Sequence, residues 1–171
     1  MQISLNDLMA YTDWERRKWR QWLPQHGNQV LDLGAGPHGD GRFESVGDLV
    51  RHIFAAEKRY VERLSGRPLT DQKVVGNGDI DELFEFGEKS RQEFEDFLAT
   101  LPEDEWDTPK EFKVLNFNVA VTPRKVATHV LLHEIRHWAQ IATLLRLNGL
   151  VDEFHDLIAS PVMGGHWERE P

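Results

Sequence analysis

The sequence contains no cysteine. This absence excludes disulfides, zinc–thiolate fingers and a cysteine nucleophile, so any metal ion must be held by nitrogen and oxygen ligands. No apolar run approaches the roughly 20 residues that a membrane-spanning helix needs. The N-terminus has no positive region followed by an apolar core, so no signal peptide is visible. We therefore expect a cytoplasmic protein with no membrane partner.

Positive charge is also scarce, with 20 Lys and Arg against 29 Asp and Glu and a net charge of −9. Proteins that bind nucleic acid need clustered positive charge, so we expect no nucleic-acid partner. The basic run at residues 16–20 is interrupted by Trp19, which favours the solvent-facing side of a helix. A content of 40% hydrophobic and 29% charged residues is typical of a globular protein, and we expect a single domain over residues 1–171.

Four segments carry the three- and four-residue spacing of apolar side chains that predicts amphipathic helices, at about residues 5–23, 45–64, 79–101 and 122–147. Ser4 or Asn6 is expected to cap the first, and Ser45 with Asp48 forms an Asp variant of the capping box for the second. Residues 106–121 predict an extended or hairpin-like connection, and the last twenty residues an irregular tail. The pattern predicts an all-α four-helix bundle with one long connection before its last helix.

The last predicted helix carries His129, His133 and His137. Residues four apart lie on one helical face, about 6 Å apart along the axis, so two imidazoles at this spacing can chelate one ion. The surrounding positions are apolar, which points this face into the protein interior, where polar groups need partners. A third ligand must come from another helix, and His52 on the second predicted helix is the natural candidate. The alternative is that these histidines line their helices without a metal.

Three elements, in this order along most of the chain, resemble the DinB/YfiT-like superfamily. They are Tyr11-Thr-Asp-Trp14, the segment Leu-Val-Arg-His-Ile-Phe-Ala-Ala-Glu at residues 49–57, and His129-x-x-x-His133-Glu-x-x-His137-x-x-Gln140. The resemblance implies a four-helix bundle, often a homodimer, with one divalent metal ion on three histidines. By this resemblance the ligands are His52, His133 and His137. His129 and Gln140 are expected beside these ligands, outside the triad.

Trp138 departs from that family pattern. Family members commonly carry His-His-Arg-Gly-Gln where this chain has Arg-His-Trp-Ala-Gln at residues 136–140. A large aromatic side chain at this position can alter a pocket or a dimer surface. The substrate of a relative is therefore not transferred to this chain.

Three neutral imidazoles leave a coordination position open, which is typical of catalytic sites, and zinc, nickel or iron are all compatible with them. An open position can hold a thiolate, or a water of lowered pKa. Some members of the family are thiol-dependent transferases or isomerases. The resemblance therefore implies one of two activities: transfer of a low-molecular-weight thiol to a small electrophilic substrate, which we favour, or metal-assisted hydrolysis. A non-enzymatic, stress-related metal-binding module is the further alternative.

The segment His133-Glu134-Ile-Arg-His137 also matches the His-Glu-x-x-His motif of zinc peptidases, in which the glutamate is the general base. Under this alternative Glu134 is the catalytic residue. The third histidine of the extended motif is absent downstream, and Glu153 is the possible replacement ligand.

Two further motifs point to other folds. Residues 30–36, Val-Leu-Asp-Leu-Gly-Ala-Gly, are similar to the first motif of Rossmann-type methyltransferases, but that fold needs strands that alternate with helices, and none follow. A loop between helices is the favoured interpretation. The pair Glu134-x-x-His137 also occurs in di-iron bundles, which need a second such pair, and Asp152-x-x-His155 is a poor substitute.

Overall fold

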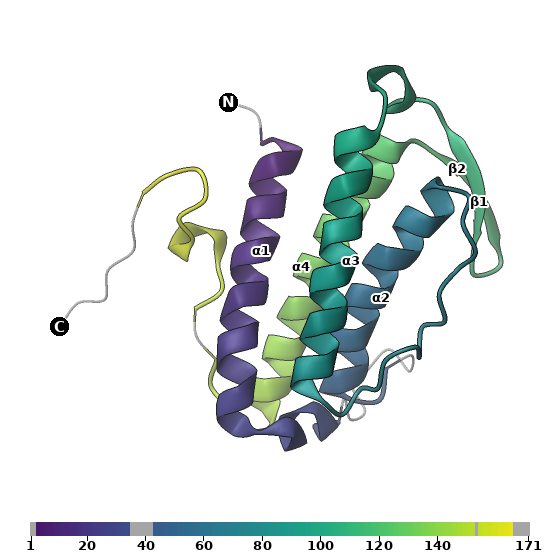
Figure 1. The fold of residues 1–171 in the computed structure, drawn as a ribbon. Helices are drawn as coiled ribbons and strands as arrows, with labels where there is room; N and C mark the ends of the chain where they lie inside the picture. The colour runs from purple at the N-terminus through teal and green to yellow at the C-terminus, as the bar shows by residue number, and fades with distance from the viewer. Residues whose placement is uncertain (1–2, 35–42, 153, 166–171) are drawn as a thin grey trace.

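The computed structural model describes residues 3–34, 43–152 and 154–165 of the chain. Four long helices lie side by side (Figure 1): α1 Leu5–Trp22, α2 Val46–Leu64, α3 Ile80–Thr100 and α4 Pro123–Leu147. An antiparallel hairpin of β1 Lys110–Val114 and β2 Phe117–Val121 joins α3 to α4. The predictions of a mostly helical fold and of a hairpin-like connection before the last helix are confirmed. No helix in the described segments is long and apolar enough to cross a membrane.

The helices begin at side chains that accept hydrogen bonds from their first turns. Ser4 Oγ accepts from the Asp7 amide at 3.1 Å, and the Asp7 carboxylate accepts from the Ser4 amide at 2.8 Å, which completes a capping box. Ser45 Oγ accepts from the Asp48 amide, but the Asp48 carboxylate accepts from the Glu44 amide instead of that of Ser45. The box predicted at Ser45 is therefore only half formed. The N-cap residues of α3 and α4 accept in the same way.

Buried apolar side chains fill the space between the helices in two clusters, one beside the turns that follow α1 and one near the hairpin. α2 packs against both α3 and α4, and α1 packs against α4. Trp138, the departure from the family pattern, is only 1% exposed and stacks on Trp19 with ring centroids 5.5 Å apart. Its place is therefore in the core rather than on a surface.

The motif at residues 30–36 does not open a parallel sheet. Residues Asn28–Asp32 form a short 3-10 helix, and the extended pairing there is a single bridge between Gly34 and Ser45. The hairpin is the only sheet among the described residues. The methyltransferase alternative thus finds no support. Residues 35–42, which hold most of the Gly-rich connection, and Glu153, the possible replacement ligand, lie outside the described residues.

Candidate metal centre

α2 and α4 bring three histidines together. His52 Nε2 lies 3.1 Å from His133 Nε2, and His133 Nε2 lies 3.0 Å from His137 Nε2. One ligand atom from each of the three residues falls within 4.8 Å of the others. Across the described segments, no other group of three or more His, Asp or Glu side chains has its potential ligand atoms this close together. The structure therefore unites the three residues that the sequence analysis selected.

The spacing of these nitrogens suits a single metal ion. Two imidazole nitrogens that each lie about 2.0–2.1 Å from one ion are roughly 3 Å apart at right-angled to tetrahedral geometry. The distances of 3.1 Å and 3.0 Å meet this requirement. The donor set of three imidazoles fits zinc, nickel or iron.

Hydrogen bonds fix the orientation of His137, which is fully buried. Its Nδ1 lies 2.5 Å from Gln140 Oε1, an atom that only accepts, so Nδ1 carries the proton. The lone pair of His137 is then on Nε2, which faces the other two histidines. The exposed side chain of Arg136 donates to the same Nε2 at 3.3 Å, which is consistent with this tautomer. Gln140 therefore lies where a residue that orients a ligand is expected.

His133 is present as the neutral imidazole. Burial, together with the neighbouring histidines and Arg136, lowers the pKa of His133 to about 2. The imidazole is therefore neutral at ordinary pH and keeps the lone pair that a metal ion needs. Phe43 covers the centre on one side, with its ring centroid 4.5 Å from that of His52 and 5.6 Å from that of His137.

His129 lies next to the triad and is not one of its members. Its ring centroid is 5.6 Å from that of His133 and 5.3 Å from that of Tyr60. The metal-competent group does not include it. It packs against Tyr60 and His133.

Glu134 is occupied by other partners. Its Oε1 accepts from Arg16 Nε at 2.6 Å and from Trp138 Nε1 at 3.0 Å. Its Oε2 accepts from Arg16 Nη2 at 2.7 Å and from Arg91 Nη2 at 2.8 Å. Burial alone raises the pKa of this carboxyl, but Arg16 and Arg91 outweigh burial and hold it below its usual value. A carboxylate has about four acceptor sites, and all are used here, so none is left to take a proton from a substrate or a water.

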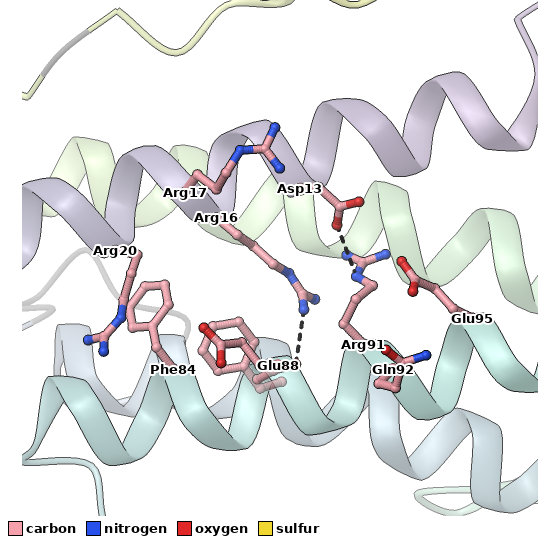
Figure 2. A pocket seen from close by; sticks show the side chains of 11 residues that line it. Asp13, Arg16, Arg17, Arg20, Phe84, Glu88, Arg91, Gln92 and Glu95 are labelled. Atoms are coloured by element: carbon pink, nitrogen blue, oxygen red, sulfur yellow. Dashed lines mark hydrogen bonds and ion pairs between the residues drawn. The ribbon is translucent and has the colours of Figure 1, made fainter.

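A buried ion network that the sequence pattern does not reveal joins Arg16, Arg91, Glu57 and Glu134. Arg16 was expected on the solvent side of its helix, and that expectation is wrong, because Arg16 is buried. Figure 2 shows the side chains of Arg16 and Arg91 between α1 and α3, where both line a groove of about 320 Å³. Helical spacing could have predicted the burial of Arg16, because Arg16 stands four residues after Thr12 and three before Trp19, and both of these residues are fully buried.

A polar cavity of about 380 Å³ opens beside the triad. His52 and Phe43 form the wall nearest the metal centre. The remaining lining carries charges of both signs and two side-chain amides: Glu44, Asp48, Arg51, Gln72, Lys73 and Asn77. Such a cavity can admit a small polar molecule to the histidines.

Comparison with known families gives one match. The model of the DinB superfamily matches residues 12–141, a segment that contains the three histidines and Gln140. No curated protein sequence matches the chain significantly.

Proposed function

Because the chain belongs to the DinB superfamily, we propose that it is a metal-dependent enzyme that transfers a low-molecular-weight thiol to a small electrophilic substrate. His52, His133 and His137 hold one divalent ion of zinc, nickel or iron on a four-helix bundle. One observation carries the proposal: three imidazole nitrogens lie close together, and His52, one of the three histidines, lines a polar cavity.

The ion, when bound, lowers the pKa of the thiol and favours the thiolate, which is the nucleophile. The chain has no cysteine, so the thiol comes from solution. In a displacement, the sulfur electron pair forms the new carbon–sulfur bond. The leaving group departs with the electron pair of the broken bond, and the thiol proton passes to solvent.

The side chains of this protein orient the reactants. Gln140 fixes the direction of His137. Lys73 in the polar cavity offers a hydrogen-bond donor to the polar body of the thiol, whereas Arg51 and Asn77 already donate to Asp48 Oδ1. Phe43 packs over His52 and keeps water away from the histidines on that side.

Hydrolysis by a His-Glu-x-x-His mechanism has weaker support. That mechanism needs Glu134 as a base beside the ion. The hydrogen bonds from Arg16, Arg91 and Trp138 occupy its carboxylate. A thiol needs no such base, since the ion alone can favour its ionised form.

The first test is elemental analysis of the purified, untagged protein. We expect about one zinc, nickel or iron per chain, lost in His52→Ala and retained in His26→Ala. His26 is a suitable control because its ring contacts that of Trp22, outside the triad. Absence of metal after loading and dialysis would contradict the proposal.

The second test is turnover of the metal-loaded protein with chlorodinitrobenzene and a panel of small thiols. We expect thioether formation that disappears in His52→Ala and persists in His26→Ala. Ester hydrolysis without thiol transfer would assign the centre to a hydrolase. Metal binding with neither activity would assign it to a non-enzymatic module.

The proposal includes a single domain over residues 1–171 that forms a homodimer. Leu132 and Leu147 on α4 are 52% and 63% exposed, and these are apolar side chains that a partner subunit can cover. Sedimentation analysis should give twice the chain mass. A stable monomer at micromolar concentration would contradict the dimer and leave the metal centre untouched.

A further inference from the structure

The hairpin presents an apolar face toward α2 and α4. Its register pairs Phe112 with Val119 and Val114 with Phe117, and residues directly opposite each other share a face. Val121 belongs to the same face. Phe112 and Val121 pack against the core cluster near the hairpin.

The rest of this apolar face borders a cavity of about 260 Å³, called here the hairpin cavity. Carbon atoms dominate its wall, and the side chains that can offer a polar atom are Tyr60, Lys125 and His129. A mostly apolar hollow with a few polar groups is the usual character of a small-molecule pocket, and this one is of a size for a small ligand.

A continuous series of ring contacts joins the hairpin cavity to the metal centre. Phe112 lies 6.5 Å from Tyr60, Tyr60 lies 5.3 Å from His129, and His129 lies 5.6 Å from the metal-site residue His133, all between ring centroids. Tyr60 and His129 line the hairpin cavity themselves. Only one ring therefore separates the cavity from a ligand of the triad.

The polar cavity lies at the other end of the same series. From His133 the contacts continue to His52 at 4.9 Å and from His52 to Phe43 at 4.5 Å. Phe43 and His52 line the polar cavity. Two cavities of opposite character thus flank the histidine triad along α2 and α4.

We propose that the hairpin cavity is the subsite for the apolar part of the electrophilic substrate, which is a small aromatic or branched-alkyl molecule that carries a carboxylate. The volume admits a ring or a short branched chain. Lys125 supplies a positive charge at the wall, and no acidic side chain among the described residues pairs with it. The assignment to the substrate rests on the proposed function, while binding itself can be tested without it.

The test uses cinnamate, an aromatic carboxylate, on the metal-free protein. We expect it to shift the methyl resonances of Val114, Val119 and Val121. Val119→Glu places a carboxylate in the apolar wall and should weaken cinnamate binding by at least about tenfold. The matched control is Ala120→Glu, one residue along the same strand on the opposite, exposed face, and it should bind as the wild type does.

A second pair of variants tests the charge. Lys125→Met should weaken binding of cinnamate and leave binding of neutral cinnamyl alcohol unchanged. Lys113→Met, on the exposed face of the hairpin, should change neither. Circular dichroism and metal content that match the wild type establish that each variant is folded.

Three results would overturn the proposal. They are the absence of valine methyl shifts, equal loss of binding in Val119→Glu and Ala120→Glu, and a dimer that Val119→Glu dissociates while cinnamate binds nowhere. The last result would make this face a contact between subunits. Because the measurement needs neither metal nor turnover, cinnamate binding without thiol transfer would contradict the proposed function alone.

Discussion

At the scale of single residues, the candidate metal centre includes an amide side chain that contacts one of the three histidines. Gln140 stands three residues after His137 on α4. Its Oε1 accepts a hydrogen bond from Nδ1 of the His137 ring. Without this acceptor the ring can turn, and either nitrogen can carry the proton. The lone pair on Nε2 then has no fixed direction.

Gln140→Ala should lower the affinity for the metal by about 10–100-fold, because a ligand loses the group that orients it. Gln140→Glu should restore most of the affinity, since a carboxylate also accepts from Nδ1. Competition with a chelator gives the affinities, and Gln92→Ala on α3 is the control. Equal metal affinity in the wild type and in Gln140→Ala would show that Gln140 does not position His137.

The candidate ligands were accessible from the sequence, whereas the ion network was not. The four-residue step between His133 and His137 places both on one helical face, and the family resemblance adds His52. The structure brings these three side chains together. Arg16 is different, because basic side chains are almost never fully buried unless they are paired, and a partner such as Glu134, far along the chain, is not visible in a local pattern.

At the scale of elements, α2 and α3 pack closely because Gly87 has no side chain. A Cβ at this position would lie 2.8 Å from carbons of the Phe54 ring, which is fully buried. Arg16 Nη1 also donates to the Gly87 carbonyl at 3.2 Å. The glycine therefore permits a helix contact and a hydrogen bond from α1 at the same point.

Gly87→Ala should destabilise the protein, although alanine favours helices by about 1 kcal/mol over glycine. Overpacking against a fixed ring costs about 1–3 kcal/mol, which outweighs that gain. Urea denaturation measures the difference. Gly78→Ala, where a Cβ would meet nothing within 4 Å, should be neutral. Stabilisation by Gly87→Ala would show that the Phe54 ring can move.

The ion network joins all four helices, since Arg16, Glu57, Arg91 and Glu134 come from α1, α2, α3 and α4. Glu134→Ala should lower the free energy of unfolding by about 3–5 kcal/mol, because it leaves Arg16 and Arg91 buried without this partner. Denaturation measures the loss, and Glu88→Ala on the exposed side of α3 is the control. Wild-type stability in Glu134→Ala would mean that water replaces the carboxylate.

Helix limits could be read from caps and apolar spacing, as Ser4 and Ser45 illustrate. The short 3-10 helix Asn28–Asp32 could not, because a brief apolar run has no periodicity that separates helix from strand. The hairpin was visible in its alternating valines, but its register depends on the turn at Leu115, whose φ is 53°. Most non-glycine residues avoid a positive φ, so the conformation of Leu115 could not be predicted from the sequence.

At the scale of the whole molecule, burial of the histidines makes stability depend on pH. The pKa of His133 is about 2 in the folded protein, against an ordinary value of 6.5. Between these values the unfolded chain binds the proton and the folded chain does not. The free energy of unfolding therefore falls as the pH falls through this window.

The metal-free protein should lose stability from about pH 7 to about pH 5, where most carboxylates are still ionised. His133→Asn should show a weaker dependence, while His26→Asn should keep the wild-type slope. Urea denaturation at several pH values gives the slopes. A flat profile in the wild type would mean that the triad titrates normally in the folded state.

His133 and Glu134 are neighbours on α4, and their side chains leave the helix about 100° apart. The ion network holds Glu134 through four hydrogen bonds, so it fixes the rotation of α4 about its axis and with it the direction of His133. An ion that binds the triad would meet imidazoles that are already aligned, so little conformational entropy would be lost on binding. Its capture would need no slow rearrangement of the chain beforehand.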